Sequence, residues 1–397
     1  MTEGRPQRYP WHYGLPLALY YATLGIYQGY AAKYYELQGV AADSTRMMWL
    51  MAINPLVALV AQSLWGMVGD RLRWRNTALL VMCLMSAAAM ALLPVSGAFM
   101  WMLAVNFLFA GFFTPVQPMA DSIILEDMYR TRAAYGPVRL MGSLGYALTN
   151  LLLAGFFEGR FHIVPWATVG FALMMGLSML VLPRTAGHQR GKQKVPISGA
   201  LRAPHMIPLL LMTTGLQLAM GYFYSYFTLY FTSMPDGTSG LLGLGYFLSA
   251  VFELPFLIFS DRLFRRWGAG RLMVVSALLL CIRFVMMGLA PTAGWLVASQ
   301  LLHGGGFVVI SVSMAKYISQ TFPDELKTAG QMVLSVVAYG LARVFGTFVG
   351  GGISRVTGGP AGGFLAMAAL CLVCFVWGAW YFFRVPPLNG MEPAVSR

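Results

Sequence analysis

Two charged residues of opposite sign, Asp121 and Arg139, stand among apolar runs long enough to cross a bilayer. A short turn with Arg130 and Arg132 separates them. An ionisable group at membrane depth costs roughly 2.5–3.5 kcal/mol or more, so such groups are usually paired and usually functional. The segment 121–146 is therefore predicted to carry the chemistry of the protein. A structural ion pair between two helices is the alternative explanation.

Further ionisable residues lie inside apolar runs of the second half: Glu253, Arg283, His303 and Arg343. Each also admits a structural interpretation. The carboxylate can bond to backbone freed by a following proline, the histidine can be satisfied in the core, and the arginines can snorkel or pair. If the protein moves protons, Asp121, Glu253 and His303 are the titratable candidates.

Tyrosines are frequent in the apolar runs 13–35 and 205–231. Aromatic belts at the membrane interface explain some of them. Tyr27 and Tyr224 fall too far inside the runs for this explanation. A cavity lined by tyrosine suits a ligand with one apolar face and several hydroxyls, such as a sugar or nucleoside. It equally suits an aromatic acid, with Arg139 as the clamp for its carboxylate.

The composition is that of a polytopic membrane protein. Of 397 residues, 58% are hydrophobic and 10% are charged, and the mean hydropathy is +0.65. The net charge of +13 arises from basic residues in short loops, which is typical of topology signals and not of nucleic-acid binding. The four cysteines lie inside apolar runs, so we expect free thiols, no disulfide framework and no metal site.

At ~20 residues per span, the length accommodates about twelve helices. The fold class is thus all-α, with both termini cytoplasmic because most lysines and arginines then fall in cytoplasmic loops. The expected spans are 13–35, 46–68, 76–94, 98–124, 137–157, 165–183, 205–231, 240–260, 271–290, 294–317, 326–350 and 362–383.

The chain divides into two predicted halves. The longest polar segment, 184–204, would be a cytoplasmic linker between six-helix bundles at 1–183 and 205–397. An internal repeat supports this division, because Tyr135–Ser143 resembles Tyr339–Thr347. Two pseudo-symmetric bundles related as parallel repeats would explain the match.

A second repeated motif lies between the expected second and third spans of each half. Gly66 precedes Asp70 and Arg71 in the first copy, and Asp261 and Arg262 form a degenerate second copy. The motif resembles the loop signature of the major facilitator superfamily. The resemblance implies a latch, in which the Asp accepts bonds from a helix N-terminus and from arginine and which breaks during alternating access. An ordinary basic loop is the alternative.

The opening segment shows a narrower resemblance. Asp121, Arg139 and the following Ser143 and Tyr146 are similar to the sugar site of the lactose permease group, which has nucleoside and phenylpropionate permeases among its relatives. The resemblance implies that the acid and the arginine bond sugar hydroxyls and that the aromatic side chain stacks on the sugar ring. The group has tryptophan where this chain has Tyr146.

The resemblance continues in the second half at Arg283 and His303, with Glu253 near the place of the group's helix-8 carboxylate. There are also departures. The carboxylate that releases the coupling proton in that group falls on Gly306 here, and Gln300 occupies the place of a lysine. Glu253 and His303 therefore remain as the candidates for proton coupling in this half.

These features predict a secondary active transporter, a proton-coupled symporter that imports a small sugar or glycoside by alternating access across the cell (inner or plasma) membrane. The alternatives are a proton-coupled permease for nucleosides or small aromatic acids, or an efflux antiporter. We expect a monomer without cofactors that binds no nucleic acid. An enzyme is disfavoured because the five histidines are scattered and no HExxH or GxSxG motif is present. A non-transporting sensor is also disfavoured, because sensors usually carry a soluble domain in addition to their membrane spans.

Overall fold

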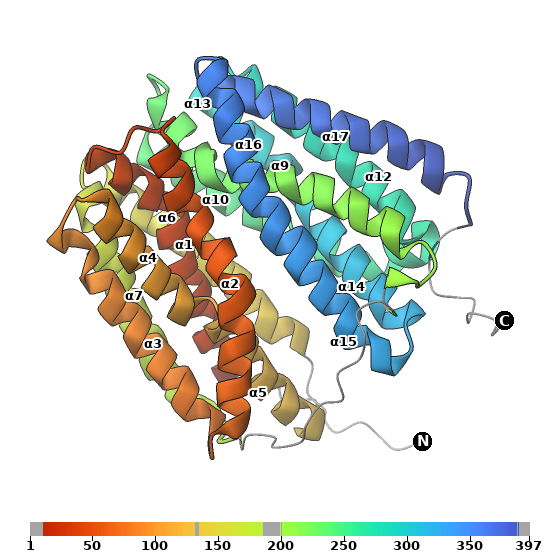
Figure 1. Cartoon of the computed structure of the whole chain (residues 1–397), viewed down its shortest axis with the longest axis horizontal. Coiled ribbons are helices and arrows are strands. Elements are labelled where there is room, and N and C mark those ends of the chain that lie inside the picture. Colours follow the sequence, from red (N-terminus) through yellow and green to blue (C-terminus); the bar gives the residue numbers. More distant parts are fainter. Residues whose placement is uncertain (1–10, 132–134, 186–198, 200, 387, 389–397) are drawn as a thin grey trace. The chain divides into compact units, whose positions relative to one another are not determined.

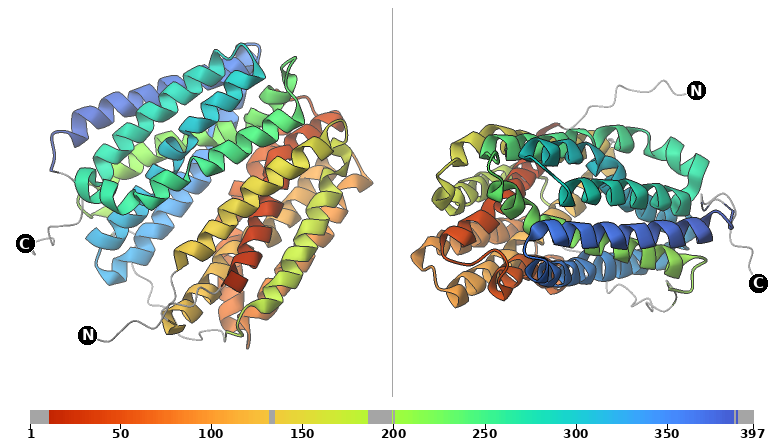
Figure 2. Two further views of the ribbon diagram at one scale, coloured as in Figure 1. Left: turned by 180° about the vertical axis from the view of Figure 1, so that it is seen from behind. Right: turned by 90° about the horizontal axis from the view of Figure 1, so that it is seen from above.

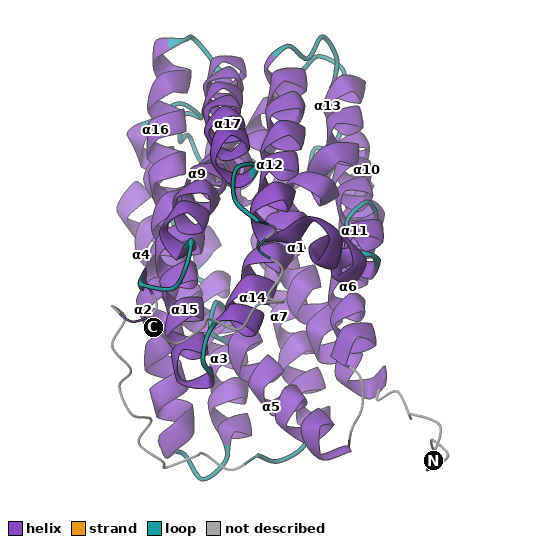
Figure 3. Cartoon of the chain, turned by 90° about the vertical axis from the view of Figure 1, so that its right-hand side faces the viewer, coloured by secondary structure: helices purple, strands orange, loops and turns teal. Residues whose placement is uncertain are grey.

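The computed structural model describes residues 11–131, 135–185, 199, 201–386 and 388. Within these residues the regular elements are all helices, and no strand occurs (Figure 3). The all-α prediction is confirmed. The chain forms two compact units, one of residues 1–42 and 49–191 and the other of residues 43–48 and 192–397. Most of the predicted linker lies outside the described residues, so its role as the boundary between the halves stays a prediction.

The first unit is built around α1 and α3. Helix α1 packs along α6 and α7, and α3 packs along α4 and α7 (Figure 2). A Cβ at Gly145 would overlap the backbone of Ala18, so glycine there lets α6 approach α1 closely. The helices are η1 (Trp11–Tyr13), α1 (Gly14–Leu37), α2 (Thr45–Arg71), α3 (Arg75–Ala91), η2 (Leu93–Val95), α4 (Phe99–Phe113), α5 (Val116–Thr131), α6 (Tyr135–Phe157), η3 (Phe161–Ile163), α7 (Val164–Ser178) and η4 (Met179–Val181).

The second unit packs α12 against α14 and α17, and α9 against α16 and α17 (Figure 1). Helix α12 is kinked at Gly268, whose φ of 68° favours glycine. The helices are α9 (Met206–Ser233), α10 (Ser239–Val251), α11 (Leu254–Ile258), α12 (Ser260–Gly288), α13 (Ala293–Ser299), η5 (Gln300–Leu302), η6 (Gly304–Val308), α14 (Val309–Thr321), α15 (Asp324–Val333), η7 (Leu334–Leu341), α16 (Ala342–Val356) and α17 (Pro360–Phe382).

Eleven helical segments of the described chain are long and apolar enough to cross a membrane. Helix α1 is not among them, although it has 24 residues. Its six tyrosines and the pair Lys33 and Glu36 lower its mean hydropathy. Tyr20, Tyr30 and Tyr35 are nevertheless buried within the first unit. The membrane-protein class is therefore confirmed, and the number of twelve spans stays a prediction.

Two helices change their winding inside a predicted span. The span 294–317 contains the 3₁₀ turn η5 and the π-helix η6, and the span 326–350 contains the π-helix η7. Helices of the π type are rare and often mark functional sites. Both π segments adjoin candidate residues, because His303 directly precedes η6 and Arg343 follows η7.

Candidate functional site

In the first unit, Arg139 of α6 reaches an aromatic ring of α1. Its guanidinium carbon lies 4.4 Å from the centre of the Tyr21 ring. Its Nη1 is buried and has no hydrogen-bond partner among the described residues. Asp121 on α5 accepts a hydrogen bond of 3.2 Å from the side-chain amide of Gln117. Asp121 thus has a hydrogen-bond partner on its own helix, and Arg139 has one buried N–H donor without a partner among the described residues.

Ser143 and Tyr146 lie one and two turns after Arg139, on the same face of α6. Both side chains are half-buried. A Cβ added at Gly25 of α1 would lie 3.2 Å from the Tyr146 ring, so this face of α6 is turned towards α1. The structure therefore groups Arg139, Ser143 and Tyr146 on one helix face that lies along α1.

The hydroxyl of Tyr27 belongs to a buried polar network. Tyr27 and Tyr35 of α1 each donate to Oδ1 of Asn106 on α4, both at 2.6 Å. The amide of Asn54 on α2 donates to the Tyr27 hydroxyl. The network joins three helices, and it occupies the hydroxyl that was predicted to face the substrate. Substrate binding by Tyr27 stays a prediction.

In the second unit, Glu253 and His303 are brought together. Helix α10 ends at Val251, and Pro255 stands in the first turn of α11, which leaves Glu253 at the break between the two helices. The Nε2 atom of His303 lies 3.3 Å from a carboxylate oxygen of Glu253. His303 is 5% exposed, and its Nδ1 has no hydrogen-bond partner in the described part of the chain. A buried imidazole and a carboxylate at this distance can share a proton.

Gly304 is the residue that allows this contact. A Cβ at this position would overlap the carbonyl oxygen of Phe252 and would lie 2.8 Å from the Cα atom of Glu253. Glycine therefore lets the backbone after His303 pass directly beside the break between α10 and α11.

Arg283 of α12 is fully buried, with 0% exposure. One of its Nη atoms donates to Oε1 of Gln300 at 2.8 Å. Its guanidinium carbon lies 4.1 Å from the centre of the Phe223 ring on α9. Its Nε has no partner among the residues that the structure describes. The charge is thus stabilised by an amide and an aromatic face.

Arg343 of α16 is surrounded in a similar way. Its Nε donates to Oε1 of Gln217 on α9 at 3.0 Å. Its guanidinium carbon lies 5.0 Å from the ring centre of Tyr224, 5.3 Å from that of Tyr339 and 5.8 Å from that of Phe307. The predicted partners Tyr224 and Arg343 are therefore in contact.

Two phenylalanines connect these groups. The His303 ring lies 5.8 Å from the ring of Phe223 and 5.4 Å from that of Phe307. Tyr224 contacts both phenylalanines. Arg283, His303 and Arg343 therefore surround one aromatic cluster of Phe223, Tyr224 and Phe307. Glu253 lies beside it through its contact with His303. Neither phenylalanine was predicted as a site residue, because nothing in the sequence distinguishes them from core residues.

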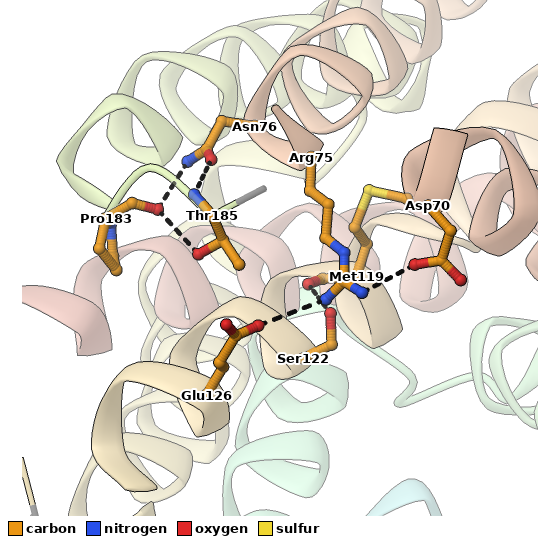
Figure 4. A network of polar contacts seen from close by, with 8 residues as sticks. All are labelled: Asp70, Arg75, Asn76, Met119, Ser122, Glu126, Pro183 and Thr185. Atoms are coloured by element: carbon orange, nitrogen blue, oxygen red, sulfur yellow. Dashed lines mark hydrogen bonds and ion pairs between the residues drawn. The ribbon is translucent and has the colours of Figure 1, made fainter. Parts of the chain in front are cut away.

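The predicted latch of the first unit contains an ion-pair network (Figure 4). Asp70 at the end of α2 pairs with Arg75 at the start of α3, at 2.7 Å. Arg75 also lies 3.6 Å from Glu126 of α5. The side chain of Arg71 is exposed, and so is Gly66, where a Cβ would meet nothing within 4 Å. Arg75 thus lies between two carboxylates, Asp70 and Glu126, and neither Arg75 as the partner of Asp70 nor the participation of Glu126 was predicted from the sequence.

Further polar bonds fix the start of α3 beside the end of the first unit (Figure 4). The amide nitrogen of Asn76 donates to the carbonyl of Pro183, and its oxygen accepts from the backbone N–H of Thr185. A Cβ at Gly69 would lie 2.8 Å from the methyl group of Met119, so α2 and α5 approach closely beside the network.

The second copy of the motif makes a simpler contact. Asp261 at the start of α12 pairs with Lys316 of α14 at 2.6 Å. Lys316 also donates to the hydroxyl of Ser260 at 3.0 Å. Arg262 is exposed. The Asp261 side chain is 77% exposed, so this ion pair contributes little to stability.

The chain is similar to a known protein family, to several transporters and to solved transporter structures. The family model described as "MFS_1 like family" matches residues 11–364. The "Maltose permease" of Geobacillus stearothermophilus is 26% identical over 356 residues, which cover 88% of each chain. The "Probable 3-phenylpropionic acid transporter" of Escherichia coli (strain K12) is 28% identical over 68% of this chain and 72% of that protein. The crystal structure of nucleoside transporter NupG superimposes with a TM-score of 0.80 at 14% identity, over 94% of this chain and 99% of that one, and supports the fold alone.

Proposed function

The chain belongs to the MFS_1 like family of the major facilitator superfamily, and from this premise we propose that it is a proton-coupled symporter. It is a multi-pass membrane transporter of a small solute. The proposal adds that it imports a sugar or glycoside by alternating access, as a monomer in the cell (inner or plasma) membrane with cytoplasmic termini. The concentration of lysine and arginine in the loops on one side supports this orientation.

The proposal of proton coupling rests on the contact between Glu253 and His303. Glu253 lies at the break between α10 and α11, and His303 lies between η5 and η6 with its imidazole almost fully buried. Adding a proton to this pair changes its net charge, and burial makes the energy of that charge depend on the conformation of the surrounding helices. Protonation can thereby bias the equilibrium between two states of the transporter.

The proposed sugar site of the first unit is centred on Arg139. A guanidinium with a free N–H can donate to sugar hydroxyls, and Tyr146 on the same helix face offers an aromatic surface for a sugar ring. The relationship to a maltose permease supports this substrate class. Small aromatic acids remain the second candidate, because Arg343 lies among aromatic rings and another relative is named for 3-phenylpropionic acid.

Asp70, Arg75 and Glu126 are proposed to form a conformational latch. The network ties the end of α2 and the start of α3 to α5. A charge-assisted bond of this kind holds one state and must be released in the other. Asp261 with Lys316 would be a weaker counterpart.

The experiment is solute counterflow into proteoliposomes, which needs no proton gradient. We expect the wild-type protein to exchange at least one labelled solute from a panel of neutral and acidic sugars and glycosides. We expect Arg139→Gln to lose this exchange and Arg160→Gln, a change at an exposed arginine beside Phe156, to retain it. Full exchange by Arg139→Gln would refute the proposal that Arg139 binds the substrate. Absence of exchange of any sugar, nucleoside or aromatic acid by the wild-type protein would refute transport of these solutes.

A further inference from the structure

The middle of the helices of the second unit contains more positive than negative charge. Arg283 and Arg343 are its two arginines, and Glu253 is its one carboxylate. Glu253 makes its ion-pair contact with His303. In the described part of the chain, no carboxylate oxygen lies within 4.0 Å of either arginine. The unit thus holds buried positive charge without a counter-ion in contact.

This arrangement is costly for a membrane protein. A guanidinium does not lose its proton, so Arg283 cannot become neutral to avoid the cost. Its hydrogen bonds go to Gln300 and to the sulfur of Met220, and its cation–π contacts are with Phe223 and Phe284. None of these side chains carries a charge. Buried charges in proteins are normally paired with an opposite charge. A missing partner therefore points to a group that the chain does not itself supply.

Unused hydrogen-bond donors identify the chemistry of that group. The Nε atom of Arg283 is buried without a partner. The same holds for Nε2 of Gln217, the donor end of an amide whose oxygen accepts from Arg343. Neither Nη atom of Arg343 makes a hydrogen bond within the described chain. All of these positions donate, so their complement is an acceptor with negative charge.

Aromatic rings in mutual contact adjoin both arginines. Phe223 lies against Arg283, and Phe307 lies against Arg343, with Tyr224 in contact with both rings. Aromatic faces of this kind suit contact with a flat or ring-shaped ligand. A planar carboxylate fits the fork of a guanidinium through two parallel bonds.

We propose that the transported solute is an acid: a ring-bearing monocarboxylate whose carboxylate is the counter-ion of Arg343 and Arg283. A glycoside with an acidic sugar meets this description, as does an aromatic acid. The inference rests on the proposed transport function and narrows its substrate class. A neutral sugar has no negative charge and therefore cannot act as the counter-ion of these arginines.

The test uses two ligands that differ only in the charged group: phenyl β-D-glucuronide and phenyl β-D-glucoside. Ligand binding to the folded protein raises its melting temperature in proportion to the logarithm of ligand concentration over Kd. We expect the glucuronide to stabilise the wild-type protein and the glucoside to have little effect. A second pair, 3-phenylpropanoate and 3-phenylpropanol, repeats the comparison without a sugar, and binding of either acid fulfils the prediction.

Two variants connect binding to the arginines. Arg343→Gln should weaken binding of the acid by roughly tenfold to a hundredfold, the loss typical of one charge-assisted bond, and leave any binding of the neutral ligand unchanged. Arg343→Lys keeps the charge without the fork and should fall between the two. Arg384→Gln is the matched control, since Arg384 also lies over a ring, that of Trp380 at 4.7 Å, but is exposed. These variants avoid the fully buried Arg283, whose replacement can unfold the protein.

Equal stabilisation by acid and neutral analogue would overturn the inference, and so would the absence of binding by either acid. Stabilisation by chloride, added to a methanesulfonate buffer, without stabilisation by the acids would also overturn it, because the counter-ion would then be inorganic. In each case, sugar exchange in the counterflow assay would leave the proposed transport function intact. Loss of all exchange there would refute the function itself.

Discussion

The substitution Gly304→Ala tests the packing that brings Glu253 and His303 together. The added methyl group would overlap the Phe252 carbonyl and lie 2.8 Å from the Cα atom of Glu253. The obstructing atoms are backbone, so no side-chain rotation can relieve the overlap. The segment after His303 must therefore move away from the break between α10 and α11.

The expected magnitude follows from two opposing effects. Overpacking a well-packed interior costs about 1–3 kcal/mol. Replacing a glycine inside a helix by alanine gains about 0.5–1 kcal/mol. The net destabilisation is then about 1–2 kcal/mol, which corresponds to a fall in melting temperature of about 2–8 °C for a unit of this size.

The assay is thermal unfolding of purified protein, together with uptake driven by a pH gradient. Gly352→Ala in α16 is the control, because a Cβ there meets nothing within 4 Å and should be neutral or mildly stabilising. We expect Gly304→Ala to lower both the melting temperature and the proton-driven uptake. A variant as stable and as active as the control would refute the argument that a close backbone approach maintains the contact.

Three further predictions concern other contacts. Arg75→Gln should impair turnover in the counterflow assay by releasing the α2–α3–α5 network, whereas the exposed Arg71→Gln should not; equal rates would contradict the assignment of the latch. Lys316→Met should change the unfolding free energy by less than about 1 kcal/mol, because Asp261 is largely exposed. Tyr27→Phe should cost about 1–3 kcal/mol in thermal or chemical unfolding, since the buried Asn106 loses a donor and the half-buried Asn54 amide loses its acceptor; an unchanged midpoint would contradict this.

The sequence revealed the fold because a membrane imposes a strong pattern. Long apolar runs separated by basic loops are sufficient to predict an all-helical transporter, and their positions correspond to the helices observed. The tyrosine-rich α1 shows the limit of this reasoning. Its hydropathy alone does not identify it as a span, because its polar hydroxyls are satisfied by neighbours such as Asn106 that lie far away in the sequence.

The candidate site could be predicted in part for the same reason. Charges within apolar runs are conspicuous, so Glu253, His303, Arg283 and Arg343 could be identified before the structure was known. Their mutual contacts could not, since these depend on how the helices rotate and where they break. Neutral contributors such as Phe223 have no such signal.

The latch shows a related limit. The loop between α2 and α3 contains several basic residues, and the motif directs attention to Arg71. The structure instead pairs Asp70 with Arg75, because residue 75 begins the next helix and faces α5. The choice between neighbouring arginines is made by the turn geometry, which the residue types do not determine.

Proton-driven accumulation of solute in proteoliposomes tests the central claim most directly. With an inwardly directed proton gradient, the wild-type protein should concentrate its substrate, and the gradient should collapse as it does so. Glu253→Gln should abolish accumulation but retain counterflow, while Glu36→Gln, a change at a partly exposed ion pair of α1, should behave like the wild-type protein. Accumulation by Glu253→Gln equal to that of the wild-type protein, or wild-type transport that ignores the gradient, would contradict coupling through the Glu253–His303 pair.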